Sequence, residues 1–218
     1  MCTNFALIKK DGTARLAARL GVSDDDWVFS SNHKPGSQIS VVCQNDGENR
    51  VLIATWWLYL QQTATGLKPH PDYFSVNTNH AKLAQKAEYR TSRCVIPVSA
   101  FVESQGGKRP YLLEPNDGSA MPFGGLYKHW VDKVSGEEVF SASIITLSGH
   151  PALENIHRKS TPLWLPDDAL DAWLDPDMPN TEIFKDLLVP ALRVPLRATP
   201  IDKTMLKNPI GESFLIDG

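Results

Sequence analysis

Cys2 is the residue with the most distinctive chemistry in this sequence, because it directly follows the initiating Met1. If Met1 is removed, Cys2 carries an α-amine and a thiol on adjacent carbons. The ordinary pKa of an α-amine is about 8, so a useful fraction of it is neutral near pH 7. A neutral amine attacks an aldehyde to give a Schiff base, and the thiol can then close a thiazolidine ring. The simpler alternative is that a cysteine at position 2 is incidental.

Several short segments farther along the chain bear on this choice. They are residues 75–79 (Ser-Val-Asn-Thr-Asn), 93–97 (Arg-Cys-Val-Ile-Pro), 100–103 (Ala-Phe-Val-Glu), 123–127 (Phe-Gly-Gly-Leu-Tyr), 140–141, 145–146 and 156–159 (Ile-His-Arg-Lys), the last shortly before Pro162. Asn32 and Pro35 add an Asn-x-x-Pro turn. No single segment is specific, but their order and spacing from residue 2 to residue 162 form a distinctive set.

This ordered set resembles the SOS response-associated peptidase (SRAP) family from end to end. The resemblance implies a protein whose N-terminal cysteine forms a covalent bond with abasic sites in single-stranded DNA, and which removes its own Met1. It implies no cofactor and no metal ion. It also implies a barrel-like fold and a role in DNA damage repair.

The resemblance places four residues at the reactive site. Cys2 matches the nucleophile, and Asn77 matches an asparagine that orients the N-terminal residue and the sugar. Glu103 matches a glutamate that handles protons, and His157 matches a histidine that helps to open the abasic sugar. These types suit the task, because opening a closed sugar and losing water both need a proton donor and acceptor. Taken singly, Glu103 and His157 fit ordinary structural roles, and Asn77 fits a helix cap or turn.

The chain departs from the family pattern where phosphate contacts are expected. Asn4 and Asn79 stand where the family has arginines, and Ser104 replaces an aromatic residue after Glu103. The spacing from His157 to the following proline also differs. The predicted DNA-binding set is Asn4, Pro35, Trp56, Trp57, Asn79, Arg90, Arg93, Arg158 and Lys159. We therefore expect DNA binding that is single-strand selective and salt-sensitive but weak. For the aromatic members and for Phe74, base stacking competes with ordinary core packing.

Two other functions remain open on the sequence. One is a cysteine or N-terminal-nucleophile amidohydrolase that uses Cys2, His157 and Glu103. The other is a non-covalent single-strand binder in which the covalent chemistry has been lost. A stable adduct with an abasic oligonucleotide, turnover of an amide, or neither would distinguish the three.

The elements that must position these residues are mainly strands. β-Branched and aromatic residues predict strands at 2–8, 39–43, 51–60, 94–102, 111–114, 123–131 and 139–147. Apolar spacing predicts helices at 13–20, 79–88 and 182–188, and one that starts at Asp167 or Asp168 and runs through Trp173. Pro97 indicates an edge strand or a bulge. Without strict alternation of strands and helices, the pattern indicates an α+β fold, a single domain over residues 1–218 with mostly antiparallel sheets forming a barrel and flanking helices.

Composition limits the remaining possibilities. The 218 residues are 42% apolar and 22% charged, as in a soluble globular protein. No apolar run reaches the ~20 residues that span a bilayer, and no secretory signal is present. Besides Cys2, Cys43 and Cys94 are expected in the core, and three sparse cysteines favour a reducing cytoplasm over disulfides or zinc. We expect a monomer, associated with the nucleoid if the source is bacterial.

The net charge of −3 counts against a nucleic-acid partner unless the protein has a local basic groove. Basic residues gather in three segments, which could form such a groove. The alternative interpretation is that they are solvated surface positions. They are Lys9 and Lys10; Lys82, Lys86, Arg90 and Arg93; and Arg158 and Lys159.

Overall fold

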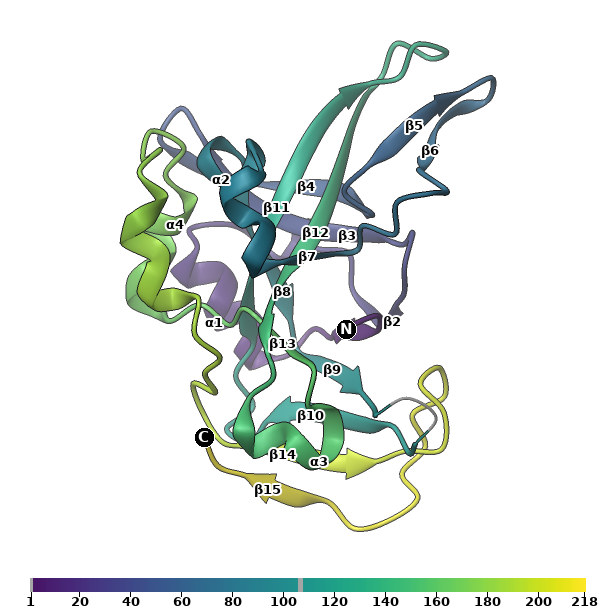
Figure 1. Cartoon of the computed structure of the whole chain (residues 1–218), viewed down its shortest axis with the longest axis vertical. Helices are drawn as coiled ribbons and strands as arrows, with labels where there is room; N and C mark the ends of the chain where they lie inside the picture. The colour runs from purple at the N-terminus through teal and green to yellow at the C-terminus, as the bar shows by residue number, and fades with distance from the viewer. Residues whose placement is uncertain (1, 106–107) are drawn as a thin grey trace.

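A closed five-stranded barrel forms the centre of the computed structural model, which describes residues 2–105 and 108–218 (Figure 1). Its strands follow the order β11 (Met121–Val131), β8 (Arg93–Val98), β3 (Gln38–Asn45), β4 (Glu48–Trp56) and β12 (Glu138–Ser148), and β11 pairs with β12 to close it. Two short strands extend β12: β7 (Asn77–Asn79) in parallel and β13 (Ser160–Pro162) antiparallel. Met1, whose removal the sequence predicts, lies outside the described residues.

Local sequence explains how the barrel closes. Asp46 and Gly47 both have positive φ, 52° and 79°, as a two-residue hairpin between β3 and β4 requires. At Gly125 a Cβ atom would lie 2.8 Å from the carbonyl oxygen of Ser143 on β12, so only glycine allows this close pairing. The predicted α+β fold with a mostly antiparallel barrel is confirmed, although β12 pairs in parallel with both β4 and β7.

A second sheet lies below the barrel in Figure 1. Its order is β15 (Phe214–Ile216), β14 (Leu196–Pro200), β10 (Tyr111–Pro115), β9 (Ala100–Glu103), β1 (Phe5–Leu7) and β2 (Ser30–His33). A separate hairpin joins β5 (Leu60–Thr63) to β6 (Gly66–Pro69). The sequence did not predict β2, β6, β7, β13, β14 or β15.

Ser99 divides the predicted strand 94–102 between the two sheets. Its amide and its hydroxyl both donate to the carbonyl oxygen of Ala6, at 2.8 and 2.9 Å, and its hydroxyl accepts from the amide of Ile8. The chain therefore leaves the barrel after β8 and joins β1 as β9. Pro97 faces Pro122 on β11, a pairing that needs no amide donor from either residue. β8 pairs with β11 on one side and with β3 on the other, so the prediction of an edge strand at Pro97 is wrong.

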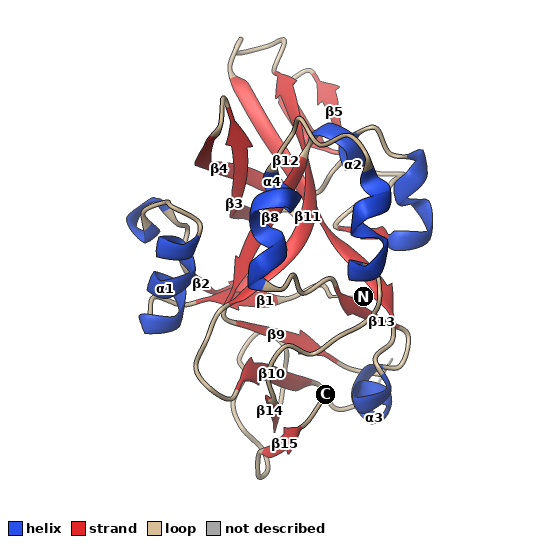
Figure 2. Cartoon of the chain, turned by 90° about the vertical axis from the view of Figure 1, so that its left-hand side faces the viewer, coloured by secondary structure: helices blue, strands red, loops and turns tan. Residues whose placement is uncertain are grey.

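Helices cover one side of the barrel, as Figure 2 shows for α1, α2 and α4. The α-helices are α1 (Asp11–Arg19), α2 (Glu88–Thr91), α3 (Glu154–His157) and α4 (Leu170–Leu174). The 3₁₀ turns are η1 (Asp24–Asp26), η2 (His80–Gln85), η3 (Pro151–Leu153), η4 (Asp167–Ala169) and η5 (Thr181–Leu187). The predicted helix at 79–88 is thus η2 followed by α2, and the one at 182–188 is the 3₁₀ turn η5. No helix within the described ranges is long and apolar enough to cross a membrane.

The core consists of two buried clusters. One contains Cys2, Phe5, Trp56 and Cys94, and the other packs the helices against the outside of the barrel. Cys43 and Cys94 are buried, which confirms their predicted place in the core. Arg93 is also buried, and its guanidinium lies under α2 and α4 instead of facing solvent. Its nitrogens donate to the carbonyl oxygens of Trp173 (2.7 Å), Tyr89 (2.8 Å), Arg90 (2.7 Å), Asp175 and Met178 (3.1 Å).

Arg93 should therefore be a stability residue. An Arg93→Met variant leaves buried carbonyl oxygens without donors, so we expect it to lower the free energy of unfolding by about 2–5 kcal/mol. Arg90→Met, on the exposed face of α2, is the matched control and should change it by less than about 0.5 kcal/mol. Urea denaturation measures both, and equal stability of the two variants would contradict this role for Arg93.

Candidate functional site

The N-terminal segment is held in place by rings on both sides of Phe5. The Phe5 ring centroid lies 4.8 Å from that of His33 and 4.8 Å from that of Trp56. Phe5 also pairs with Phe101 on β9 and with His33 on β2. Trp56 is fully buried, and its indole nitrogen donates to the carbonyl oxygen of Val76 at 2.9 Å. The Trp56 side chain thus fixes both β1, through Phe5, and the segment that leads into β7, through Val76.

Cys2 lies at the buried start of this segment with 0% of its surface exposed. Its carbonyl oxygen accepts a hydrogen bond from the side-chain amide of Asn77 at 2.7 Å. Its thiol contacts the carbonyl oxygen of Asn4 at 3.7 Å. Burial, reinforced by the nearby charge of Glu103, raises the pKa of the Cys2 thiol far above its ordinary value. The thiol is therefore protonated at neutral pH.

Glu103 and His157 approach each other from different parts of the chain. The pairing of β9 with β1 brings the end of β9 beside the N-terminus, and α3 carries His157. Oε2 of Glu103 lies 3.4 Å from Nδ1 of His157, and Nδ1 also lies 2.8 Å from the carbonyl oxygen of Ser104. Because a carbonyl oxygen only accepts, we assign the ring hydrogen to Nδ1. Nε2, 3.3 Å from the hydroxyl of Ser160, then acts as an acceptor.

Burial makes both groups suitable for proton transfer near pH 7. It raises the pKa of Glu103 to about 7, because a charged carboxylate is poorly solvated there. It lowers the pKa of His157, so the imidazole is neutral at the same pH. A carboxyl that is half protonated beside a neutral imidazole can give or take a proton.

A pocket of about 640 Å³ opens beside His157 and Asn77. Its lining is rich in basic and hydroxyl-bearing side chains: Asn77, Asn79, Ser104, Gln105, Lys108, Thr146, His157, Arg158, Lys159 and Ser160. A second hollow of about 380 Å³ shares Asn77 and Asn79 with it and continues past Lys82, Lys86, Tyr59, Tyr73 and Phe74. We call the two together the basic groove. Both hollows contain cations, and the second also contains aromatic side chains. Cations and aromatic faces along one groove are the combination that binds a single nucleic-acid strand.

The aromatic surface of the groove comes from Tyr73 and Phe74, which are 59% and 52% exposed. Phe74 packs edge-on against Trp57, with ring centroids 4.9 Å apart, and Trp57 is itself half-buried. Phe74 therefore presents the ring that a base can reach, and Trp57 supports it from below.

The predicted DNA-binding residues separate into three groups. Asn79, Arg158 and Lys159 line the basic groove. Three others are not among its lining residues: Pro35 in the turn between β2 and β3, Trp57 behind Phe74, and Arg90 on α2. Trp56, Arg93 and Asn4 are buried. Direct DNA contact is wrong for these three, because Trp56 packs in the core, Arg93 binds backbone carbonyls, and Asn4 donates to Asn32.

The sequence reasoning missed Lys108, Ser160 and Tyr73 as groove residues. Lys108 follows β9 by only a few residues, and Ser160 follows the His-Arg-Lys segment, but neither belongs to a recognisable motif. Tyr73 precedes Phe74 in a polar stretch, and two adjacent exposed aromatics were the available signal. The four reactive-site residues are brought together by β1, β7, β9 and α3.

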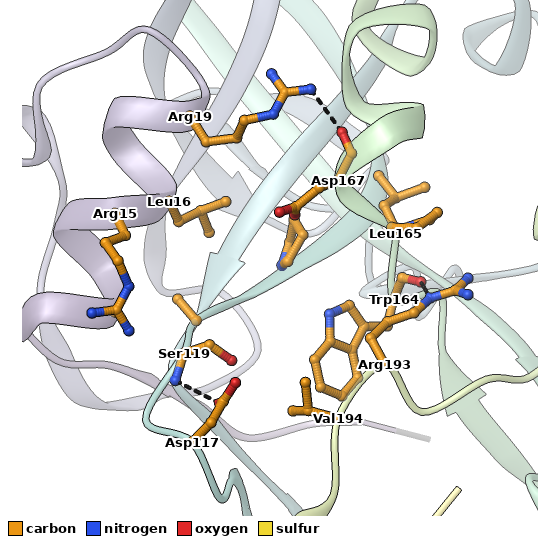
Figure 3. Close-up of a pocket in the computed structure, with 14 residues that line it drawn as sticks. Arg15, Leu16, Arg19, Asp117, Ser119, Trp164, Leu165, Asp167, Arg193 and Val194 are labelled. Atoms are coloured by element: carbon orange, nitrogen blue, oxygen red, sulfur yellow. Dashed lines mark hydrogen bonds between the residues drawn. The ribbon is translucent and has the colours of Figure 1, made fainter.

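A separate pocket of about 480 Å³ lies between α1 and the segment that precedes α4 (Figure 3). Arg19 there donates to the carboxylate of Asp171 at 3.0 Å, and Arg193 donates to the carbonyl oxygen of Trp164 at 3.1 Å. The described residues that line it include no cysteine and no histidine. Its described lining therefore lacks the thiol and the imidazole that lie around Cys2.

Known proteins match this chain over most of its length. It is 28% identical over 200 residues to the abasic site processing protein YobE of Bacillus subtilis (strain 168), covering 87% of this chain and 89% of that protein. It is 24% identical over 197 residues to the abasic site processing protein HMCES of Xenopus tropicalis, covering 74% of this chain but only 58% of that protein.

Solved structures share the fold. A crystal structure of a protein from Bacteroides thetaiotaomicron matches with a TM-score of 0.73 at 20% identity, covering 92% of each chain. One from Bordetella bronchiseptica matches with a TM-score of 0.71 at 18% identity, covering 93% of this chain and 100% of that one.

The sequence profile described as SOS response associated peptidase (SRAP) matches residues 1–208. The chain therefore belongs to the SRAP family.

Proposed function

We propose that this protein processes abasic sites by forming a covalent adduct between Cys2 and the abasic sugar in single-stranded DNA. The observation that carries the proposal is that Cys2, Asn77, Glu103 and His157 lie together at the inner side of the basic groove. Asn77 and His157 line the groove, and Cys2 and Glu103 are buried behind them. The names of the curated relatives, which are abasic site processing proteins, support the substrate. The cations and aromatic side chains of the basic groove support a nucleic-acid strand as the larger ligand.

The chemistry follows from groups already in place. Glu103 and His157 move the protons that open the sugar and expose its C1′ aldehyde. The neutral α-amine of Cys2 adds to this carbon, and loss of water leaves a Schiff base. The thiol then adds across the C=N bond, so its sulfur bonds to carbon and its proton passes to nitrogen. The product is a thiazolidine ring, and no outside oxidant or reductant is needed.

Removal of Met1 is part of the same proposal, because only a free α-amine on Cys2 permits ring closure. Asn77 holds the Cys2 carbonyl, which fixes the residue while the preceding peptide bond is cut by water. Glu103 is the nearby group that can carry the proton for this hydrolysis. The activity is thus a self-directed peptidase step followed by DNA crosslinking.

The amidohydrolase alternative fits the site less well. A thiol that attacks amides with turnover is normally activated by an adjacent base and has a lowered pKa. Burial and the nearby Glu103 act in the opposite direction on Cys2. An amine-first reaction with an aldehyde does not require a thiolate. The third possibility, a non-covalent binder, predicts no adduct at all.

Cys2 itself provides the most direct test of the proposal. Untagged protein should begin at Cys2 and should form an adduct with a single-stranded oligonucleotide in which a uracil has been converted to an abasic site. Cys2→Ala should abolish the adduct but keep the fold. Intact-mass spectrometry and denaturing gels measure the two outcomes. Retention of Met1 on most molecules, or an adduct on Cys2→Ala protein, would count against the mechanism.

Glu103→Gln should slow adduct formation by about 10²- to 10⁴-fold, because glutamine keeps the shape but cannot exchange a proton. Single-turnover kinetics with abasic single-stranded DNA measures the rate. The double variant Glu103→Gln/Gln105→Glu has a carboxyl at the groove but not at position 103. It should therefore react as slowly as Glu103→Gln alone. A wild-type rate for Glu103→Gln would remove Glu103 from the chemistry.

Stability provides an independent check on Glu103. Its pKa rises from an ordinary value of 4.5 to about 7 in the folded protein, so the folded state holds the proton more tightly. The stability that Glu103 contributes is therefore fully present below pH 4.5 and is lost as the pH rises through about 7. The free energy of unfolding falls by roughly 3 kcal/mol over this range. The decline in unfolding free energy over this range should be smaller in Glu103→Gln. Parallel pH profiles of the two proteins would contradict the raised pKa.

Phe74→Ala should weaken binding of undamaged single-stranded DNA by about 1–3 kcal/mol, the energy of stacking one base on an aromatic ring. Ile183→Ala is the control, because Ile183 is 48% exposed on η5 but does not line the groove. Fluorescence anisotropy measures the affinities. An equal effect of both substitutions would contradict a stacking role for Phe74.

A further inference from the structure

A lysine from the C-terminal part of the chain reaches the N-terminal strands. Lys207 lies in the loop between β14 and β15, which approaches β2 in Figure 1. Its ammonium group donates to the carbonyl oxygen of Ser31 at 2.8 Å and to the side-chain oxygen of Asn32 at 3.2 Å. Asn32 also accepts a hydrogen bond from the Asn4 side chain, and the Asn4 carbonyl contacts the Cys2 thiol. Lys207 is therefore linked to the reactive cysteine through two neutral amides.

Lys207 binds neutral oxygens, and no ion pair with a carboxylate is found for it in the described part of the chain. Asp202, an acid in the same loop, instead accepts from the amides of Lys203 and Asn208. An ammonium group has three hydrogens, and two of them go to Ser31 and Asn32. One donor remains for an external acceptor.

The loop holds this lysine in an uncommon backbone conformation. Lys207 has a φ of 56°, in the left-handed region that side-chain-bearing residues seldom occupy. Its amide donates to the carbonyl oxygen of Lys203 at 2.8 Å, and the amide of Asp202 donates to the carbonyl oxygen of Asn208 at 3.0 Å. These bonds fix the loop so that the half-buried side chain points back to Ser31. Strain maintained in this way is characteristic of functional positions.

We propose that Lys207 binds a phosphate of the single strand on the β2 side of Cys2, outside the basic groove. The inference rests on the proposed function, since it takes the ligand to be the DNA strand whose abasic sugar reacts with Cys2. A lysine ammonium binds phosphate as a point charge, and this one lies beside neutral Asn4 and Asn32, which supply no charge of their own. With Lys207 on one side and Arg158 and Lys159 on the other, the strand has cationic contacts before and after the abasic nucleotide.

The alternative role is purely structural, in which Lys207 only ties the loop to β2. The salt dependence of binding distinguishes the two, because a phosphate contact releases a counterion and a tether does not. The measurement is fluorescence anisotropy with an undamaged single-stranded oligonucleotide over a series of salt concentrations. The variants are Lys207→Gln, Lys207→Arg and Lys203→Gln, the last an exposed lysine in the same loop.

We expect Lys207→Gln to weaken binding about threefold to tenfold and to reduce the slope of log K against log salt by about 0.7, one phosphate contact on a single strand. Lys207→Arg should restore the slope, and Lys203→Gln should match wild type. A wild-type slope for Lys207→Gln, or an equal reduction by Lys203→Gln, would overturn the assignment while the proposed function stands. Wild-type protein that neither binds single strands nor forms the abasic adduct would overturn both.

Discussion

The packing of Phe5 between His33 and Trp56 is the constraint on which the rest of the site depends. The first residues of a chain normally fray, because few contacts oppose their conformational entropy. Here two ring contacts at 4.8 Å and strand pairing on both sides fix the segment within three residues of Cys2. Trp56 extends the same constraint to β7 through its bond to Val76, so Asn77 and Cys2 share one rigid support.

Burial then sets the electrostatics of the pocket. Glu103 reaches it because Ser99 transfers the chain from the barrel to the second sheet, and His157 reaches it from α3. Few water molecules solvate these groups, so the neutral forms of the carboxyl, the imidazole and the thiol are all favoured. The positive charges lie outside this dry centre, on Lys108, Arg158 and Lys159 along the groove.

The sequence predicted the long elements, and it selected four residues that lie close together in the fold, but it was less accurate about which side chains are exposed around them. Strands such as β3, β11 and β12 are long enough to show an apolar pattern, whereas β7 and β15 have three residues each and carry none. Trp56 and Arg93 were misassigned because type alone does not reveal burial, and their partners Val76 and Trp173 lie 20 and 80 residues away in the chain. Lys207 was invisible for the same reason, since its contact with Ser31 spans 176 residues. The segment around Glu103, by contrast, is contiguous in the chain, so a resemblance between sequences can select it without knowledge of the fold.

The burial of Cys2 has a further consequence for how long the protein stays competent. Peroxides and other oxidants react with thiolate, and a thiol with a strongly raised pKa provides almost none of it at neutral pH. In the proposed mechanism the α-amine attacks the aldehyde first, so the Cys2 thiol can stay protonated and unoxidised until the Schiff base has formed.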